Sequence, residues 1–494
     1  MGRILFLQKV ATDLKTSNSL IYKESLALLT DLYQLTMVYG YWKSGYADRQ
    51  AVFHLNFRKR PFKGNFAIAA GLETAIAFIQ EFRFSKEDLA YLATLGPFEP
   101  LFLDFLAGFK FSCDVDAMPE GSVAFPYEPI LRVKGPIWQA QLLETALLNI
   151  INFQTLIATK AARICMAAHP DPVIEFGVRR AQGIDGGISA SRAAFIGGCE
   201  ATSNVIAGKL FNIPVRGTHA HSWVTAFDDE TIAFETFAEI MPKGCVLLVD
   251  TYNSIEGTKK AIKVAHKLKS KGFELAGIRL DSGDLAALSI EIRKLLDAEG
   301  FQSTQIMASN ELDEYLIRDL KQQGAKIGVW GVGTHLVTGK EQPALDGVYK
   351  LSAIQDEKGQ WQYKLKTSEQ TAKVTNPGIL QVRRYFDGVF YSADAIYDEL
   401  IGIPDPCVAM NYYDSNDHSS FETSKSKDVL VPIFRTGELV YDCPTLEAIK
   451  SLTNLELSRL PASVKRFVNP QPYFVGLEKN LLQKKLELIQ KTKK

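Results

Sequence analysis

Short apolar runs recur along the middle of the chain, and a stretch with helical periodicity follows each of them. Every run ends in glycine or polar residues, and successive runs lie about 20–30 residues apart, which suits βα units. Runs that are apolar throughout are typical of parallel strands buried on both faces. The seven runs are Val173–Phe176, Ala194–Ile196, Pro214–Val215, Val246–Val249, Gly277–Leu280, Ile306–Ala308 and Ile327–Trp330.

Seven such units predict an α/β fold whose main domain is an irregular, TIM-like parallel barrel of about seven strands. A doubly wound open sheet is the competing architecture. We assign the barrel to residues 135–346 and expect a long, mostly apolar helix over Trp138–Met166. Residues 1–134 mix helical and strand patterns, which predicts an N-terminal α+β domain with helical spacing over Ala67–Phe82.

Residues 347–494 form a C-terminal region in which alternating segments flank turn sequences. Asp387-Gly388 is a strong hairpin turn, and an amphipathic last helix is expected from about Gly476. The expected hairpins are Val348–Ile354 with Trp361–Leu365, Ile379–Tyr385 with Val389–Tyr391, and Val429–Phe434 with Glu438–Val440.

The composition narrows the classes of function. With 56 Lys and Arg against 56 Asp and Glu the formal net charge is +0, so a nucleic-acid-binding surface is not expected. No apolar run reaches the ~18 residues that a membrane span needs. The six cysteines are scattered without a Cys/His cluster. This favours buried thiols in a reducing cytoplasm over a zinc site or a disulfide framework.

Polar residues at the ends of the predicted strands are the candidates for chemistry, because barrel active sites lie at the carboxyl ends of strands. Arg179, Arg180 and Arg279 can grip anionic oxygens through planar, bidentate donors. Gly331-Val332-Gly333-Thr334 follows the last run, where backbone N–H groups can bind phosphate, although a lone glycine pair can equally serve only a turn.

Carboxylates and histidines follow other runs. Asp250, Asp281 and Asp284 can hold ribose hydroxyls or Mg²⁺, which takes few carboxylates together with substrate phosphates. The alternative for Asp284 is a helix N-cap, the commonest use of such a residue. His219 and His221 lie two residues apart and suit proton or phosphoryl transfer.

Six segments carry a resemblance to a known family, and the resemblance covers nearly the whole chain. They are Thr30–Met37, Glu175–Arg180, Gly217–Ser222, Arg279–Asp284, Gly331–Thr334 and Lys373–Gly378. In these segments the sequence resembles the nicotinate phosphoribosyltransferases, which are type II phosphoribosyltransferases. The resemblance implies an irregular barrel beside a domain built partly from the N-terminal segment and partly from the chain after the barrel, so that part of residues 347–494 returns to the N-terminal domain.

The resemblance also implies a reaction. Nicotinate and 5-phosphoribosyl-1-pyrophosphate would give nicotinate mononucleotide and pyrophosphate in NAD salvage, with ATP hydrolysis coupled through a phosphohistidine and with Mg²⁺ as cofactor. A cytoplasmic homodimer with shared active sites is expected. The alternatives are a nicotinamide or quinolinate phosphoribosyltransferase, or a catalytically silent nucleotide-binding barrel with a regulatory role.

Residue roles follow from the same resemblance, with His221, Asp281 and Arg279 as the catalytic group. His221, which precedes a serine, matches the phosphorylated histidine of the family. The other implied roles are Phe176 and Tyr33 on the two faces of the pyridine ring, with Tyr33 from the second subunit, Arg279 and Thr218 at nicotinate, Arg179, Gly331, Gly333 and Thr334 around the 5′-phosphate, and Asp250, Asp281 and Asp284 at the ribose or Mg²⁺.

Substrate choice rests on Ser203 and Asn204. Related nicotinamide enzymes carry an aspartate that accepts from the amide, and ungapped matching places Asn204 at that position. A buried carboxylate would repel the carboxylate of nicotinate, whereas Ser203 and Asn204 can donate hydrogen bonds. We therefore expect the acid rather than the amide as substrate; the alternative is that the two residues only start a helix.

Overall fold

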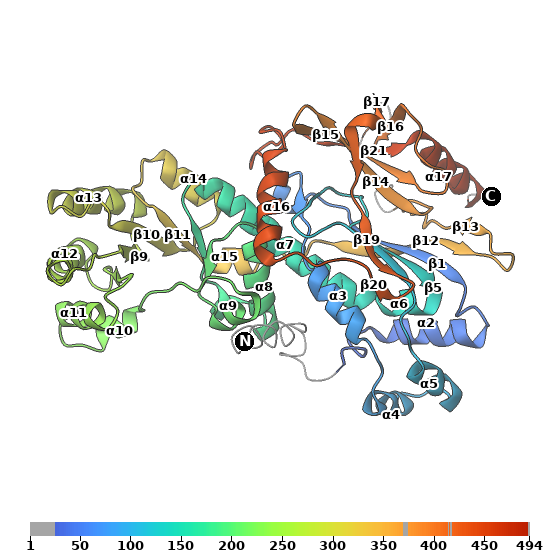
Figure 1. Ribbon diagram of the computed structural model, residues 1–494, viewed down its shortest axis with the longest axis horizontal. Helices are drawn as coiled ribbons and strands as arrows, with labels where there is room; N and C mark the ends of the chain where they lie inside the picture. Colours follow the sequence, from blue (N-terminus) through green and yellow to red (C-terminus); the bar gives the residue numbers. More distant parts are fainter. Residues whose placement is uncertain (1–24, 369–373, 413, 415–416, 493–494) are drawn as a thin grey trace, which may run out of the picture. The chain divides into compact units, whose positions relative to one another are not determined.

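The computed structural model describes residues 25–368, 374–412, 414 and 417–492 (Figure 1). Contacts divide the chain into two compact units. Residues 157–343 form one unit, which we call the parallel-sheet unit, and residues 1–156 together with 344–494 form the other, the two-sheet unit. No helix in the described ranges has both the length and the apolar character that crossing a membrane requires.

The parallel-sheet unit contains six parallel strands in the order β7-β6-β11-β10-β9-β8. Their bounds are β6 Val173–Glu175, β7 Ala201–Thr202, β8 Val246–Leu248, β9 Gly277–Leu280, β10 Gln305–Asn310 and β11 Val329–Val332. The helices are α7 Glu144–Ala168, which begins in the other unit, α8 Ile184–Ile196, α9 Val205–Phe211, α10 His221–Thr225, α11 Glu230–Ile240, α12 Ser254–Ser270, α13 Leu285–Ala298, α14 Glu314–Gln322 and α15 Thr334–Val337, with a 3₁₀ turn, η3, over Val178–Arg180.

Four helices of this unit, α9, α12, α13 and α14, are capped by polar residues that follow the carboxyl ends of strands. Asn253 accepts the backbone N–H groups of Ile255 and Glu256 and starts α12. Asp313 starts α14 in the same way. Such caps satisfy the backbone donors that the first helical turn leaves unpaired. The strand ends therefore carry polar residues for two separate reasons, capping and chemistry.

The strand order bears on the predicted barrel. β11, the last strand, pairs with β6, the first, which is a pairing that a closed barrel requires. β7 and β8 nevertheless stand at the two edges, and the described pairing does not close the sheet. The TIM-like barrel is therefore not confirmed, whereas a mixed α/β fold with a parallel sheet is.

One of the seven predicted strands is wrong and another is only partly formed. Ala194–Ile196 is the end of α8, whereas Pro214–Val215 forms a single parallel bridge, between Val215 and Thr202 of β7. A short, fully buried apolar run has the same pattern in a helix as in a strand, which explains the first error. β7 was missed because two residues are too short to give a pattern.

The two-sheet unit contains a seven-stranded antiparallel sheet in the order β13-β12-β1-β5-β3-β19-β20 and a six-stranded mixed sheet in the order β17-β16-β21-β15-β14-β18. A small sheet pairs β2 with β4. The first sheet is built from β1 Gln50–Phe57, β3 Asp114–Ala117, β5 Leu131–Pro136, β12 Gly347–Gln355, β13 Trp361–Tyr363, β19 Val431–Arg435 and β20 Glu438–Leu439. The remaining strands are β2 Ala67–Ile68, β4 Val123–Ala124, β14 Leu380–Asp387, β15 Phe390–Asp398, β16 Cys407–Asn411, β17 His418–Phe421, β18 Ser426–Asp428 and β21 Phe474–Glu478.

The helices of this unit modify two predictions. The expected helix from Trp138 is two helices, α6 and α7, and the last helix begins at Lys479, because Gly476 lies inside β21. Over Ala67–Phe82 a short strand precedes the helix. The helices are α2 Leu32–Lys43, α3 Leu72–Glu81, α4 Lys86–Thr94, α5 Pro100–Ala107, α6 Ile137–Leu142, α16 Leu446–Ser458 and α17 Lys479–Thr492, with 3₁₀ turns η2 Pro61–Lys63 and η5 Thr423–Lys425.

The three predicted hairpins are confirmed as β12 with β13, β14 with β15, and β19 with β20. Gly388, in the turn between β14 and β15, has φ of 58°, the left-handed conformation that favours glycine at this position.

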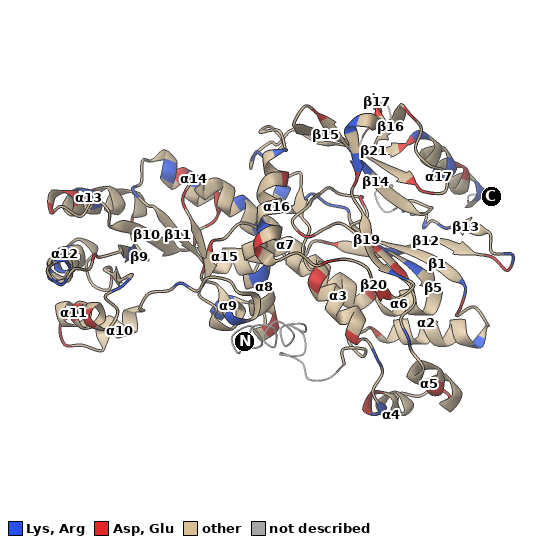
Figure 2. Ribbon diagram, viewed as in Figure 1, with Lys and Arg blue, Asp and Glu red and all other residues tan. Residues whose placement is uncertain are grey.

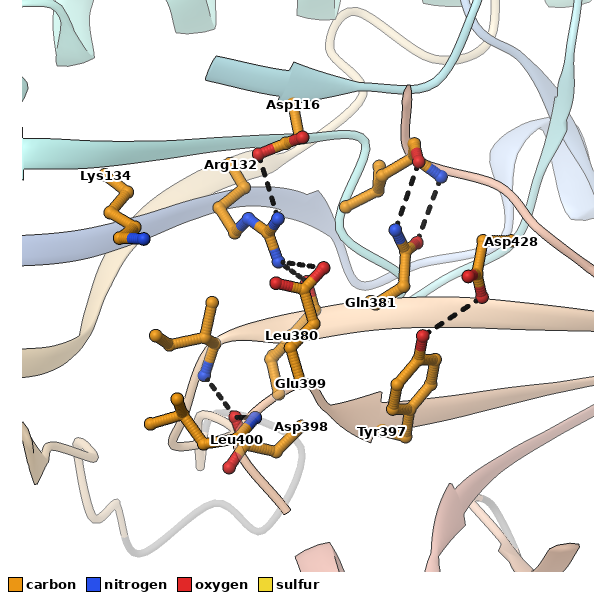
Figure 3. Close-up of polar contacts among 12 residues, drawn as sticks. Asp116, Arg132, Lys134, Leu380, Gln381, Tyr397, Asp398, Glu399, Leu400 and Asp428 are labelled. Carbon is orange, nitrogen blue, oxygen red and sulfur yellow. Dashed lines mark hydrogen bonds and ion pairs between the residues drawn. The ribbon is translucent and has the colours of Figure 1, made fainter. Parts of the chain in front are cut away.

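Figure 3 shows how polar groups join the two larger sheets: Arg132 of β5 donates to Asp116 of β3 and also to the carbonyl of Leu380 in β14.

Candidate active site

Arg279 of β9 is the centre of a hydrogen-bonded cluster in the parallel-sheet unit. Its side chain is 13% exposed, and each of its three nitrogen atoms has a different partner. Nε donates to Ser309 Oγ at 2.7 Å, Nη1 to Thr218 Oγ1 at 3.0 Å and Nη2 to Asp281 Oδ1 at 2.9 Å. The structure thus brings together three predicted site residues, Arg279, Thr218 and Asp281, from two different strand ends.

A further carboxylate and a histidine lie beside this cluster. Asp250 Oδ2 accepts the backbone N–H of Asp281 and the hydroxyl of Ser282, both at 2.7 Å. His221 Nε2 lies 3.7 Å from Asp281 Oδ2 and 4.0 Å from Asp250 Oδ1, and its Nδ1 is 3.3 Å from Thr251 Oγ1. With 43% of its side chain exposed, His221 is open to a ligand, whereas Asp250 is buried.

The charge of Asp281 is stabilised by its neighbours. Partial burial acts to raise the pKa of Asp281, but the hydrogen bond from Ser309 and the positive charge of Arg279 outweigh it and hold the pKa below its ordinary value. Asp281 is therefore a carboxylate at neutral pH, with one oxygen bound by Arg279 and the other facing His221.

Phe176 provides an aromatic surface next to Arg279. The guanidinium carbon lies 5.5 Å from the centroid of the Phe176 ring. The ring packs so closely over Gly331 of β11 that a Cβ at Gly331 would approach it to 2.7 Å. Gly331 thus has a packing role that its position in the predicted phosphate loop did not suggest.

His219 is a structural residue in this geometry. It is 7% exposed, and its Nε2 accepts the backbone N–H of Leu248 at 3.2 Å. Burial lowers the pKa of His219 to about 4, so the ring is neutral at physiological pH. The contrast with the exposed ring of His221 favours His221 as the reactive histidine of the pair.

Asn204 belongs to a buried polar network around Glu175. Its side-chain nitrogen donates to Ser191 Oγ at 3.1 Å and to the carbonyl of Gly187 at 3.3 Å, and its oxygen accepts the N–H of Ala207 as the N-cap of α9. Glu175 in turn accepts from Ser191 and Thr202. These contacts use both amide hydrogens of Asn204, which is the helix-starting role we kept as the alternative. Its contact with nicotinate stays a prediction, as does that of Ser203, which directly precedes it.

Other predicted residues lie outside the hydrogen-bonded cluster. Arg179 and Arg180 are exposed in η3, just after Phe176. Asp284 caps α13, where one oxygen accepts the N–H groups of Ala286 and Ala287. Gly333 precedes α15, and Thr334, its first residue, donates to Glu311 at 3.3 Å.

Tyr33 lies in the two-sheet unit. It is on α2 and is 49% exposed. Leu32 and Met37 on the same helix are exposed as well. Its predicted place on the pyridine ring stays a prediction.

Three hydroxyl groups of the site, those of Ser309, Ser282 and Thr251, receive no role from the sequence alone. Each lies one or two positions after an apolar run, and Ser282 and Thr251 directly follow Asp281 and Asp250. Their position was a signal, but only the register of neighbouring strands shows that Ser309 lies beside Asp281. Serines and threonines at strand ends are too common to single out without that register.

The donor set suits a metal that binds with few protein ligands. No group of three or more His, Cys, Asp and Glu side chains that could hold a metal ion occurs within the described ranges. Asp250 Oδ1, however, is buried without a hydrogen-bond partner among those residues. An unpaired buried carboxylate oxygen fits Mg²⁺, which is held by one or two carboxylates together with substrate phosphates.

Polar groups gathered at the carboxyl ends of parallel strands define an α/β enzyme. Three family models specify it further. The N-terminal domain of nicotinate phosphoribosyltransferase matches residues 28–152, the nicotinate phosphoribosyltransferase family matches residues 173–366, and the C-terminal domain of that enzyme matches residues 381–485. The chain belongs to the nicotinate phosphoribosyltransferase family.

Individual relatives agree. The chain is 44% identical to the nicotinate phosphoribosyltransferase of Bacillus subtilis (strain 168), covering 95% of this chain and 96% of that protein. The Homo sapiens nicotinate phosphoribosyltransferase is 35% identical over 92% of this chain and 95% of its own. The crystal structure of human nicotinic acid phosphoribosyltransferase superposes with a TM-score of 0.82 at 32% identity, over 93% of this chain and 99% of that chain. The same overall fold recurs in nicotinate-nucleotide pyrophosphorylase from Pyrococcus furiosus, with a TM-score of 0.66 at 23% identity.

Proposed function

We propose that this protein joins nicotinate to 5-phosphoribosyl-1-pyrophosphate and releases nicotinate mononucleotide and pyrophosphate, as a step of NAD salvage. One observation carries the proposal: the guanidinium of Arg279 is fixed beside the ring of Phe176. A cation held next to an aromatic face suits a flat ring that bears a carboxylate. The membership of the family supports the same substrate pair.

The chemistry asks the protein mainly for positioning and electrostatic stabilisation. The ring nitrogen of the base forms a bond to the anomeric carbon of the ribose as the bond to pyrophosphate breaks, with oxocarbenium-like charge on the sugar in between. Asp281, ionised and partly buried, stabilises that positive charge, while Arg279 and the Phe176 ring hold the base in line.

The test is an assay of the purified protein with 5-phosphoribosyl-1-pyrophosphate, Mg²⁺ and ATP, following the formation of mononucleotide and pyrophosphate. We expect nicotinate to be converted far better than nicotinamide, because a neutral amide cannot pair with the charge of Arg279. Quinolinate, which has a second carboxylate, is the third compound tested in the assay. Equal or reversed preference among the three would refute the substrate assignment.

ATP coupling is part of the proposal and assigns a covalent role to His221. A neutral imidazole nitrogen attacks the γ-phosphorus of ATP, the new N–P bond replaces the bond to the bridging oxygen, and ADP leaves. Water then breaks the N–P bond and releases phosphate. The exposure of His221 supports this role. His221→Ala should lose ATP hydrolysis, while His219→Ala should mainly lose stability; unchanged ATP turnover in His221→Ala would exclude it as the phosphoryl carrier.

Asp250 and Asp281 would hold Mg²⁺, while Asp284 already serves α13 as a cap. When bound, Mg²⁺ neutralises negative charge on the pyrophosphate as it leaves. The exposed Arg179 and the backbone of Gly333 and Thr334 are proposed to meet the 5′-phosphate.

The architecture and assembly complete the proposal. The pairing of β6 with β11 supports a barrel that is open at one place, between β8 and the segment at Val215. The hydrogen bond from the Leu248 N–H to His219 connects the two sides of this opening. Exposed Leu32 and Tyr33 on α2 support a homodimer in which Tyr33 serves the partner's site. The cytoplasm is part of the proposal as the location of the enzyme. Mixing Tyr33→Ala with His221→Ala subunits tests this; no recovery of activity would contradict sharing.

A further inference from the structure

We propose that Ser309 is a positioning residue of this site. Its hydroxyl group holds Arg279 and Asp281 in one hydrogen-bonded ring and thereby sets the orientation in which Arg279 meets the carboxylate of the base. The inference rests on the proposed function, since it takes nicotinate as the base.

The position of Ser309 is fixed by the sheet. Ser309 pairs with Gly331 of β11, and Ala308 before it pairs with Leu280 of β9, so its side chain lies beside the segment that carries Asp281. Ser309 is 4% exposed. Because water has little access there, a donor or acceptor that loses Ser309 as its partner is left unsatisfied.

The hydroxyl group uses both of its hydrogen-bonding capacities. A serine hydroxyl has one hydrogen to donate and two lone pairs to accept with. Ser309 Oγ accepts from Arg279 Nε at 2.7 Å and donates to Asp281 Oδ1, with the Leu280 carbonyl at 3.4 Å as a weaker acceptor. Arg279 Nη2 donates to the same Asp281 oxygen, so the three side chains close a ring.

This ring fixes the guanidinium plane. With Nε bound to Ser309, Nη1 to Thr218 and Nη2 to Asp281, the guanidinium is held at all three nitrogen atoms. Three of its five N–H groups are then used, and one remains on each terminal nitrogen for a ligand. Removing the Ser309 hydroxyl frees Nε and lets the plane turn, which misdirects the two remaining donors.

The same hydroxyl group gives the two oxygens of Asp281 different partners. Oδ1 receives Ser309 and Arg279, and Oδ2 is left to face His221 Nε2 at 3.7 Å. Ser309 therefore acts on the base through Arg279 and on the histidine side of the site through Asp281. A buried serine with a purely structural role would affect neither.

Steady-state kinetics of Ser309→Ala test the inference. We expect KM for nicotinate to rise about 10-fold or more, because a hydrogen bond to a charged group is lost. KM for 5-phosphoribosyl-1-pyrophosphate should rise less, because Asp281 keeps its hydrogen bond from Arg279. Ser309→Thr keeps the hydroxyl group and should return KM for nicotinate to within about threefold of wild type.

Ser289→Ala is the matched control. Ser289 is a fully buried serine in the same unit, whose hydroxyl donates to the Ala286 carbonyl at 3.0 Å in α13, away from the site. The control should lower thermal stability without changing KM for nicotinate. The melting temperature of every variant is recorded beside its kinetics, so that loss of stability and loss of positioning are separated.

Each outcome decides the inference. An active wild-type protein together with a Ser309→Ala variant whose KM for nicotinate is unchanged overturns it and leaves the proposed function standing. Equal losses in Ser309→Ala and Ser309→Thr also overturn it. If Ser309→Ala does not fold, Ser309→Cys, similar in size but a weak donor, takes its place. Failure of both to fold makes Ser309 a folding residue and overturns the inference. A wild-type protein inactive on nicotinate overturns the proposed function and the inference together.

Discussion

The carboxylate of Asp250 accepts the backbone N–H of Asp281 at 2.7 Å. One candidate metal-binding residue therefore orients the other. A second donor, the Ser282 hydroxyl, reaches the same oxygen of Asp250. The other oxygen of Asp250 is buried without a hydrogen-bond partner within the described structure. Asp250 therefore holds the loop after β9 with one oxygen, and its other oxygen is available to bind a ligand.

Substitutions at Asp250 should separate its structural role in the loop from its role in binding a ligand. Asp250→Asn keeps an oxygen for both donors, so stability should stay near wild type, while loss of the negative charge lowers kcat roughly 10²-fold. Asp250→Ala removes the acceptor of the partly buried Asp281 N–H, while water can replace it at the exposed Ser282 hydroxyl, and should cost about 1–2 kcal/mol of unfolding free energy as well. Urea denaturation and steady-state kinetics measure the two effects. Asp319→Ala, an exposed carboxylate on α14, is the control. Equal stability loss in Asn and Ala variants would contradict the division.

Acid should destabilise the protein through His219. Its pKa is held at about 4 by burial, with the charge of Arg279 contributing, against an ordinary value of 6.5 in the unfolded chain. Between these values the unfolded state binds more protons, so stability falls as pH drops from 6.5 towards 4 and is unaffected by this group above 6.5. The loss is on the order of 2–4 kcal/mol.

The measurement is urea denaturation of wild type and His219→Asn at pH 7 and pH 5. The difference between the two pH values should be smaller in His219→Asn. His266→Asn, which replaces an exposed histidine, is the control for exchanging a histidine for asparagine. A pH dependence that His219→Asn leaves unchanged would show that His219 titrates normally.

Gly331→Ala should damage the aromatic surface at the site. The added Cβ would approach the Phe176 ring to 2.7 Å, so the ring must move from its place beside Arg279. KM for nicotinate should rise about 10-fold or more, in line with an energetic cost of about 1–3 kcal/mol for overpacking. Gly186→Ala in α8 has open space around the new Cβ and should leave KM unchanged. Normal kinetics in Gly331→Ala would mean that Phe176 does not need its present position.

Asn204→Asp distinguishes a structural asparagine from a substrate contact. The aspartate can still cap α9, but it loses the donors to Ser191 and Gly187 and places a second carboxylate next to the buried Glu175 network. We expect about 2–3 kcal/mol of lost stability with an unchanged ratio of nicotinate to nicotinamide turnover. A stable variant with a shifted ratio would instead support direct contact with the base. Asn253→Asp, which keeps a simple cap at α12, is the matched control.

The sequence predicted most of the strand positions of the parallel-sheet unit, because βα units end in recognisable polar segments. It identified Arg279, Asp281 and Asp250 on that basis, and the structure brings them together. It could not assign a role to Ser309, because that role depends on the register of β10 against β9. It also could not show that Asn204 and Asp284 are occupied as caps, since capping residues and ligand-binding residues have the same chemistry.

Charge was the least informative signal. The equal numbers of acidic and basic residues excluded a globally basic surface, and Figure 2 shows both kinds spread over the helices of both units. The charges that matter for the proposed chemistry are a few residues paired inside one unit, such as Arg279 with Asp281. A net value cannot reveal such pairs.

The pairing of β6 with β11 has a consequence for how the protein folds. It places Phe176 and Gly331, which are far apart in the chain, in direct contact, so the proposed base-binding surface forms only after a large loop has closed. Contacts of such high order are entropically late in folding. Synthesis on the ribosome therefore yields no partial site: the chain must be translated beyond β11 before any part of it can present Phe176 and Arg279 to a ligand.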